Sequence, residues 1–461
     1  MSDLILDAPT GDVRALHAVA EGDLETFLGT QSPPVSQAAA LQGFKGKVGQ
    51  VLLANDAAGA VVTALGVGEA PKADSFRAGP TRLPAGDYRL AAVPAGLTFE
   101  AIALAWAMGG YRFERYRKPK DGQARLAAPA NVELAEVRHI AASLALARDL
   151  TNTPANDMGP VEMEMAAREV AEAFGAEIGV VIGDELLAQG YPAVHAVGRA
   201  ADPRRAPRMI EIVWGRPRHP LVALVGKGVV FDSGGLDLKT AAGMRLMKKD
   251  MGGAAHALAL ARMVMAAKLP VRLVALLPVV ENAVSGDAMR PGDVLASRKG
   301  LSIEIGNTDA EGRLILADAL ARAAELDPVL TLDFATLTGA ARAALGPEVA
   351  PFYTDDEALA ADLARAAETT DDPLWRMPMW KGYEPALDSD IADVKNDPDA
   401  WAQAGSVTAA LFLRRFAPKT GWAHFDIFAW IARAGPGRPI GAEAQAIRAA
   451  YAMIKSRYAK R

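Results

Sequence analysis

The chain has 461 residues, a length at which two domains are expected because a single compact core rarely organises so many. Half of the residues are hydrophobic, and a net charge of -5 provides no broad basic field, which makes nucleic acid an improbable partner. The absence of cysteine excludes disulfides, thiolate metal sites and thiol nucleophiles.

The first 125 residues are predicted to form a small α/β domain. Strand-like apolar runs at 48–54 and 60–66 precede a helix-like segment at 99–108. Residues 118–131 are rich in proline, glycine and charge and are interpreted as a linker, and helical spacing of apolar residues then predicts a connecting helix over 133–150. The predicted bounds are 1–125 for the N-terminal domain, 126–158 for the linker and connecting helix, and 159–461 for the second domain.

From residue 159 onward, strand-like and helix-like segments alternate. Runs of leucine and β-branched residues without polar alternation are typical of strands buried on both faces. They occupy residues 178–182, 209–214, 221–225, 271–279 and 329–334, and helices are expected at 161–174, 254–267 and 314–326. This alternation predicts an α/β fold with a mostly parallel, helix-covered sheet, whose functional site lies at the carboxyl ends of the strands.

Charged residues of this second domain gather in three glycine-rich segments. GKGVVFDSGG (226–235) follows a predicted buried strand, KKDMGGAA (248–255) comes next, and NTDAEGRL (307–314) lies at the start of a predicted helix. The segments contribute four carboxylates, namely Asp232, Asp250, Asp309 and Glu311. Clustered carboxylates repel one another and bound cations usually offset that repulsion, so the pattern predicts divalent metal ions, with Mg, Mn, Co and Zn all suited to such ligands.

These segments resemble the leucyl aminopeptidase (cytosol aminopeptidase) family of dinuclear metallopeptidases. NTDAEGRL is the signature of that family, and VGKGVVFDSGG (225–235) and MKKDMGGAA (247–255) match its other two blocks in order and spacing. The resemblance runs from about residue 133 to the C-terminus. It implies that the larger C-terminal domain is catalytic and removes single residues from peptides with a free N-terminus.

The resemblance also implies a set of metal ligands. Asp232 and Glu311 would bridge two metal ions, Lys227 and Asp250 would complete the tighter site, and Asp309 would complete the more exchangeable one. A lysine amine binds a metal only when neutral, and a nearby dication lowers its pKa as any like charge does. Two zinc or manganese ions are expected, with cobalt as a further possibility.

The remaining implied residues act on the substrate. Lys239 would polarise the scissile carbonyl, and Arg313 would anchor a bicarbonate that relays a proton, because its planar fork pairs two oxygens at once. FATLTGA (334–340) matches the next block of the family, so the substrate site would include Thr336, Leu337 and Gly339. Met247 is open to two interpretations, a core methionine or a residue facing the substrate side chain.

Other positions receive structural interpretations or depart from the family pattern. Lys248 and Lys249 are interpreted as a solvated pair, and His424 as a structural histidine. Residues 428–430 replace a glycine that is usual in the family, and residues 433–439 also differ. Because this region helps to shape the first substrate pocket, the sequence does not predict a preference for leucine.

The family forms homohexamers, so a homohexamer is expected. A cytoplasmic location is expected because no secretory signal and no apolar run of about 18 residues is present. One alternative is a two-metal phosphatase, although no segment matches a phosphatase motif. Another is a regulatory or DNA-binding protein on the same scaffold, which the acidic balance disfavours. Taken alone, NTDAEGRL is also typical of a helix start capped by Asn307 or Thr308.

Overall fold

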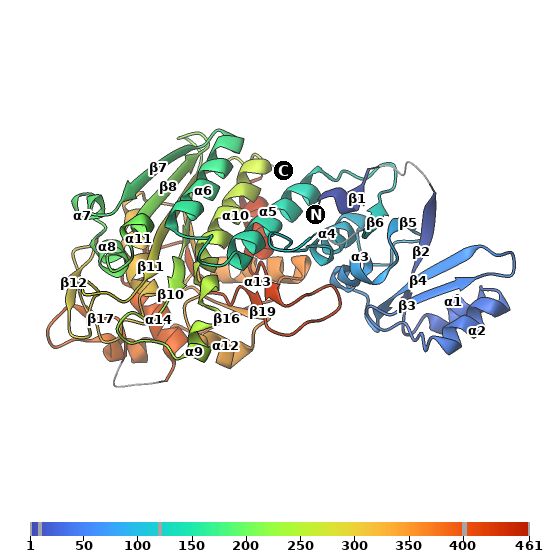
Figure 1. Cartoon of the computed structure of the whole chain (residues 1–461). Coiled ribbons are helices and arrows are strands. Elements are labelled where there is room, and N and C mark those ends of the chain that lie inside the picture. The colour runs from blue at the N-terminus through green and yellow to red at the C-terminus, as the bar shows by residue number, and fades with distance from the viewer. Residues whose placement is uncertain (1, 8–11, 119–121, 399–402, 460–461) are drawn as a thin grey trace. The chain divides into compact units, whose positions relative to one another are not determined.

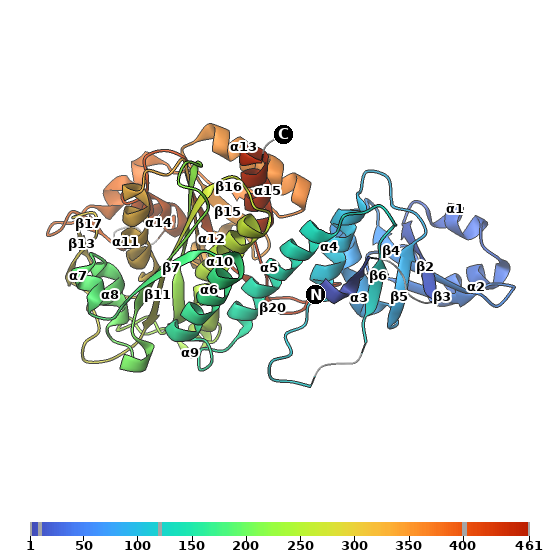
Figure 2. The same ribbon diagram turned by 90° about the horizontal axis from the view of Figure 1, so that it is seen from above.

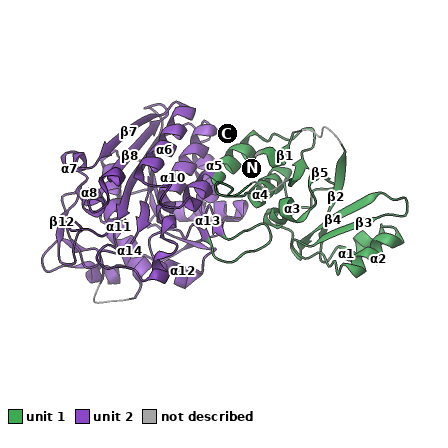
Figure 3. Ribbon diagram, viewed as in Figure 1, with its two compact units in different colours: residues 1–145, 431–440 green, residues 146–430, 441–461 purple. Residues whose placement is uncertain are grey.

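The computed structural model (Figure 1) describes residues 2–7, 12–118, 122–398 and 403–459. The chain divides into two compact units, residues 1–145 with 431–440 and residues 146–430 with 441–461 (Figure 3). Within the described ranges, no helix is long and apolar enough to cross a membrane. The domain bounds given by the sequence stay a prediction, and each unit is described here by itself.

A six-stranded sheet forms the centre of the first unit. Its order is β1 (Ile5–Leu6), β6 (Ala124–Ala127), β5 (Gly86–Leu90), β2 (Val13–Ala20), β4 (Val61–Gly68) and β3 (Val51–Asn55), with only the β4–β3 pair antiparallel. Strand β6 shows that the prediction of a linker over 118–131 was wrong there, because Ala124 and Leu126 are buried in this sheet. Residues 119–121 of that segment lie outside the described residues.

Alternation along the strands supplies apolar side chains to both faces of this sheet. Leu16 of β2 belongs to the cluster that contains Trp106 of α4 (Phe99–Gly109), whereas Val19 belongs to the cluster that contains Val35 of α2 (Pro33–Leu41). The other helices here are η1 (Ser2–Leu4), α1 (Leu24–Gly29), η2 (Ala73–Ala78) and α3 (Gly79–Arg82).

The second unit is built on a nine-stranded sheet. Its order is β16 (Leu374–Arg376), β15 (Ala350–Tyr353), β18 (Trp422–Asp426), β14 (Leu330–Ala335), β9 (Leu221–Gly226), β11 (Arg272–Asn282), β8 (Arg208–Trp214) and β7 (Glu177–Ile182), and β10 (Gly228–Asp232) pairs with β11. The four central strands from β18 to β11 are parallel, and antiparallel pairs lie toward both edges. The predicted α/β class with a mostly parallel sheet is confirmed.

Helices cover both faces of this sheet, as two perpendicular views show (Figures 1 and 2). α6 (Pro160–Phe174) and α10 (Gly252–Ala266) lie on one face, and α8 (Pro192–Gly198) and α11 (Gly312–Glu325) lie on the other. In β9, Val222 and Leu224 alternate with Ala223 and Val225, and all four side chains are buried. Burial on both faces explains why the strand sequences are apolar without alternation.

Smaller elements complete the fold. The helices are α5 (Ala135–Asn152), α7 (Glu185–Ala188), η3 (Pro203–Arg205), α9 (Ala241–Met244), η4 (Met247–Met251), α12 (Gly339–Leu345), α13 (Glu357–Thr370), η5 (Lys381–Leu387), α14 (Gly405–Arg414) and α15 (Ile447–Tyr458). The strands are β12 (Val294–Ala296), β13 (Ser302–Glu304), β17 (Val394–Lys395), β19 (Trp430–Ile431) and β20 (Gly441–Ala442).

The parallel strands bring polar residues together at one edge of the sheet. Lys227 follows β9, Thr336 follows β14, Asp426 ends β18 and Asn282 ends β11. Because these four strands run in the same direction, their carboxyl ends meet there, which is where open α/β sheets bind ligands.

Candidate metal centre

A cavity of about 600 Å³ opens at the carboxyl ends of these strands. All eleven candidate residues from the sequence line it: Lys227, Asp232, Lys239, Met247, Asp250, Asp309, Glu311, Arg313, Thr336, Leu337 and Gly339. The fold therefore brings together residues that are separated by more than a hundred positions in the chain.

One part of the cluster, here called the inner half, consists of Lys227, Asp250 and Glu311. The Lys227 Nζ lies 2.7 Å from the Asp250 Oδ2 and 3.0 Å from the Glu311 Oε1. All three side chains are almost completely buried, with at most 4% of their surface exposed. Thr336 ties them together, because its hydroxyl donates to the Asp250 Oδ1 at 2.8 Å and its carbonyl accepts from the Lys227 Nζ at 3.2 Å.

Glycine makes the inner half sterically possible. A Cβ on Gly312, the first residue of α11, would lie 2.4 Å from the Lys227 Cε and 2.7 Å from its Nζ. A Cβ at this position would push the end of the Lys227 side chain away from its carboxylates, so glycine lets the start of α11 approach the lysine. The glycine of the NTDAEGRL segment therefore serves the packing of the site.

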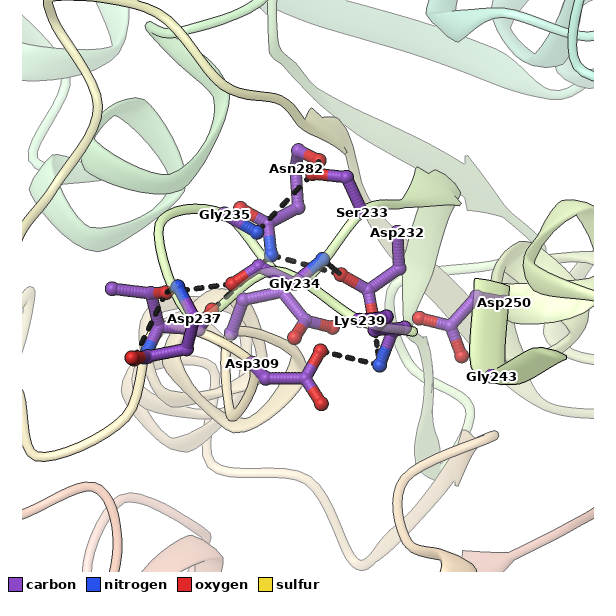
Figure 4. Close-up of polar contacts among 12 residues, drawn as sticks. Asp232, Ser233, Gly234, Gly235, Asp237, Lys239, Gly243, Asp250, Asn282 and Asp309 are labelled. Carbon is purple, nitrogen blue, oxygen red and sulfur yellow. Dashed lines mark hydrogen bonds and ion pairs between the residues drawn. The ribbon is translucent and has the colours of Figure 1, made fainter. Parts of the chain in front are cut away.

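The outer half consists of Lys239, Asp232 and Asp309. The Lys239 Nζ lies 2.8 Å from the Asp232 Oδ2 and also forms an ion pair with Asp309, and Figure 4 shows it between the two carboxylates. The Asp232 Oδ1 accepts hydrogen bonds from the Gly234 amide at 2.9 Å and from the Asn282 Nδ2 at 2.8 Å. These donors leave Oδ2 of Asp232 directed toward the cavity.

The loop that carries Asp309 is fixed by polar contacts. The Thr308 amide donates to the Asp237 Oδ2 at 2.7 Å, and the Thr308 hydroxyl donates to the Gly234 carbonyl at 2.6 Å. Gly234 has φ of +91°, a conformation that side chains with a Cβ rarely adopt. Asn396 supports the same loop, because its Nδ2 donates to the Asn307 carbonyl at 2.7 Å.

The cluster carries more negative than positive charge. Four carboxylates face two ammonium groups, so two negative charges remain uncompensated if all groups are ionised. Burial, followed by the charge of Asp232, raises the pKa of Glu311 to about 8 and that of Asp309 to about 6. Burial alone would lower the pKa of Lys227 and Lys239, but the surrounding carboxylates raise both above their usual range.

The geometry fits divalent cations. Oxygens of Asp232, Asp309 and Glu311 all lie within 4.8 Å of one another, close enough to share an ion. The Glu311 Oε2 is buried and has no hydrogen-bond partner among the described residues, a situation that is costly unless a cation is bound. Carboxylate oxygens together with an amine form a donor set that suits Mn, Co or Zn.

Arg313 lies beside this cluster in the wall of the cavity. Its Nη1 donates to the Asn396 carbonyl at 2.6 Å, whereas its Nε is buried without a partner in the described part of the chain. Burial lowers its pKa. A guanidinium with a free buried donor can hold a small anion inside the cavity.

Two of the sequence interpretations were wrong. Lys248 and Lys249 are not a solvated pair, because Lys249 is buried in the cavity wall and the Lys248 Nζ donates to the Asn152 carbonyl at 2.5 Å. Neither Asn307 nor Thr308 caps a helix, because α11 begins at Gly312. The Thr308 hydroxyl instead holds the Gly234 carbonyl.

The structure also shows the surroundings of His424 and Met247. His424 is a buried histidine whose Nδ1 lies 2.5 Å from the Asp333 Oδ1, as a structural role requires. Burial tends to lower the pKa of His424, but the Asp333 carboxylate raises it above its usual value. Met247 is half-buried and lines the cavity, so it is not a core methionine. Phe428 also lines the cavity.

Sequence reasoning missed the residues that orient the ligands. Asn282 donates to the Asp232 Oδ1 and also to the Thr308 carbonyl at 3.1 Å. Its position at the end of a long apolar run, where a strand meets the functional edge of the sheet, was a usable signal. Asn396 lies in an irregular polar segment, and nothing in that pattern distinguishes it from a surface residue.

Comparison with known proteins gives a consistent result. The family model "Cytosol aminopeptidase family, catalytic domain" matches residues 145–450, and "M17 aminopeptidase, N-terminal domain" matches residues 15–129. The chain is 38% identical over 445 residues to a probable cytosol aminopeptidase of Syntrophotalea carbinolica, and the aligned region covers 88% of each protein.

Two solved structures are similar over nearly the whole chain. The cytosol aminopeptidase from Coxiella burnetii superimposes with a TM-score of 0.93 and 43% identity, covering 99% of this chain and 100% of that one. The bottromycin maturation enzyme BotP, solved in complex with Mn, has a TM-score of 0.84 and 34% identity, covering 96% and 99%.

Proposed function

The chain belongs to the cytosol aminopeptidase family and is thus a hydrolase that acts on the N-terminal residues of peptides, and from this premise we propose that its activity depends on two divalent metal ions. One observation carries the proposal. The inner and outer halves meet at buried carboxylates, and these carboxylates bring more negative charge than the two lysines offset. The Glu311 Oε2 has no hydrogen-bond partner among the described residues, and an ion shared with Asp232 and Asp309 would bind it.

We assign the metal ligands as follows. Asp232 and Glu311 would bridge, Lys227 and Asp250 would complete the inner site, and Asp309 the outer site. Two ions held there would lower the pKa of a shared water and polarise the scissile carbonyl. The surrounding carboxylates favour charged Lys227, but a bound dication would replace the ammonium as their counterion and so would favour the neutral amine.

The other residues would act on the peptide. The carboxylates keep Lys239 an ammonium, which suits a group that stabilises negative charge on the carbonyl oxygen. Arg313 has a free buried donor that would hold bicarbonate as a proton relay. Met247, Thr336, Leu337 and Gly339 line the same cavity and would contact the N-terminal residue. The peptide must present a free α-amine, which would be held at the metal centre as a neutral ligand.

Zinc or manganese as the native metal, the homohexamer and a cytoplasmic location are also proposals. The family resemblance supports all three, and the Mn complex of BotP supports manganese. The mixed oxygen and amine ligands do not distinguish these metals.

The test uses one peptide with a free N-terminus and its N-acetylated form. The purified enzyme should trim the free peptide and leave the acetylated one intact. Chelation should abolish trimming, and Mn, Co or Zn should restore it. Rapid internal cleavage of the acetylated peptide, or full activity of protein shown by elemental analysis to be metal-free, would contradict the proposal.

A further inference from the structure

Besides Arg313, two further cations outside the metal centre line the cavity. Lys249, which directly precedes Asp250, has only 6% of its surface exposed and lines the cavity. Arg342 of α12 is exposed and lines it too. Both lie over the ring of Phe428, with the Lys249 Nζ 5.2 Å and the Arg342 Cζ 4.6 Å from its centroid.

Neither cation is neutralised by the protein. Among the described residues, no carboxylate oxygen lies within ion-pair distance of Lys249 or Arg342. The nearby acids are engaged elsewhere. Asp250 contacts Lys227 and Thr336, and both oxygens of Asp426 accept hydrogen bonds from the segment that begins α12.

An unpaired cation in a cavity wall requires a physical reason. Removing an ammonium from water is unfavourable unless an opposite charge replaces the lost hydration. The ring of Phe428 supplies a weak substitute through its quadrupole, and both cations contact this one ring. Two cations with free donors, in a cavity that receives substrate, form an arrangement that recognises an anion.

We propose that Lys249, Arg342 and Phe428 form a subsite that binds a carboxylate of the peptide substrate. The subsite rests on the proposed aminopeptidase function, since peptides bring carboxylates to this cavity. The carboxylate has two possible sources, the side chain of an acidic N-terminal residue or the C-terminus of a dipeptide. The chemistry of recognition is the same for both.

The experiment compares four dipeptides on the Mn-loaded enzyme: aspartyl-leucine, asparaginyl-leucine and the C-terminal amide of each. Aspartyl and asparaginyl peptides have nearly the same shape, so their ratio of kcat/KM reports the side-chain carboxylate. The ratio of acid to amide reports the C-terminal carboxylate. At least one ratio should be about tenfold or more in the wild type, and its identity names the source.

Three variants locate the effect. In Lys249→Met and in Arg342→Met, the kcat/KM ratio that shows the carboxylate preference should fall to within about twofold of unity. Lys249→Arg should retain most of the preference. Lys248→Met is the matched control, because Lys248 is adjacent in sequence but does not line the cavity. It should leave the ratios unchanged. If Lys249→Met does not fold, exposed Arg342 still provides the test.

Two results would overturn the subsite: equal kcat/KM for all four peptides in the wild type, or a preference that Lys249→Met and Arg342→Met leave intact. If no peptide is hydrolysed, the proposed function fails instead. Calorimetric binding of the same four peptides then decides about the subsite. A carboxylate preference that disappears in the two variants supports it, and equal binding in wild type and variants refutes it.

Discussion

The inner and outer halves of the metal centre have the same chemical composition, one lysine between two carboxylates, and differ in burial. In the inner half, Lys227, Asp250 and Glu311 have at most 4% of their side-chain surface exposed. In the outer half, Lys239 is 15% and Asp309 is 32% exposed. Water can therefore compete for an ion at Asp309 and cannot do so at Glu311, so the two halves should hold metal with different strength.

The elements that hold the two halves also differ, because the more buried half lies on the more rigid elements. Lys227 follows a central strand and Glu311 directly precedes α11, a helix that packs on the main sheet, so the inner half is fixed by the core. Asp309 lies in a loop that depends on Thr308 and Asn396 for its position. A site on loops adjusts more easily than a site on rigid elements. With ions bound as proposed, the difference in burial and support predicts one tightly held ion at the inner half and one exchangeable ion at the outer half.

The largest expected effect comes from removing one carboxylate charge in each half. Glu311→Gln keeps the shape of the side chain but removes a bridge between the ions, and it should lower kcat by about a thousandfold or more. Asp309→Asn should lose less activity and recover part of it with excess Mn. Metal content by elemental analysis and kcat at increasing Mn measure both. Equal losses with equal rescue would remove the distinction between the halves.

The second prediction separates the two lysines. Lys239→Ala should lower kcat by about a hundred- to a thousandfold, the effect of removing one group that stabilises an oxyanion, and should retain both ions. Lys227→Ala should lose metal from the inner half. Lys239→Arg should rescue poorly, because a wide guanidinium does not replace a compact ammonium.

Elemental analysis and activity on the same preparations decide between the roles. If Lys239→Ala stays within a few-fold of wild type, Lys239 has no part in the reaction. If it loses metal as Lys227→Ala does, Lys239 is a ligand and its assignment was wrong.

The inner half was easier to anticipate from sequence than what surrounds it. Lys227 and Glu311 lie next to a buried apolar run and at a helix start, and strand direction alone places such positions at one edge of a sheet. The strands and helices themselves were predictable because burial on both faces leaves a distinct apolar pattern. The segment 118–131 was not, because proline, glycine and charge around β6 outweighed four residues of strand.

Contacts between distant segments could not be predicted. Asn396 holds the Asp309 loop from the irregular segment that follows β17, a strand of a separate small sheet, and nothing local to it indicates this. Lys249 is a second example, in which the local sequence suggested the wrong environment. Two adjacent lysines are usually solvated, but the short helix η4 turns Lys249 into the cavity, and only the fold determines that direction.

The third prediction concerns the residues that orient one ligand in each half. Thr336→Val removes the hydroxyl that holds Asp250, and Asn282→Ala removes the amide that holds Asp232. Loss of such supporting contacts typically costs tenfold to a hundredfold in metal affinity. Competition with a coloured chelator should show weaker binding of the inner ion alone in Thr336→Val, and of both ions in Asn282→Ala because Asp232 would bridge them. Weaker binding of the outer ion alone in Thr336→Val, or of neither ion in Asn282→Ala, would contradict the assignment.

The smallest expected effect is the pH dependence of metal uptake. The pKa of Glu311 is raised to about 8 in the metal-free protein, so this carboxyl is mostly protonated at pH 7 and must lose its proton to bind an ion. The proton released by Glu311 should therefore make the affinity of the inner half for Mn rise by about tenfold per pH unit up to about pH 8. Asp309, with a pKa of about 6, should make the outer half nearly independent of pH above pH 7.

The pH range of this dependence also separates Glu311 from Lys227. A contribution from Glu311 levels off above pH 8, whereas a proton released by Lys227 makes affinity continue to rise, because the pKa of Lys227 lies above its usual range. Glu311→Gln should therefore lower the slope below pH 8 by the share of one proton, and Lys227→Met should remove the slope above pH 8. Calorimetry in buffers of different ionisation enthalpy counts the protons released. An affinity that is flat from pH 6 to 9 would mean that neither group gives up a proton to metal.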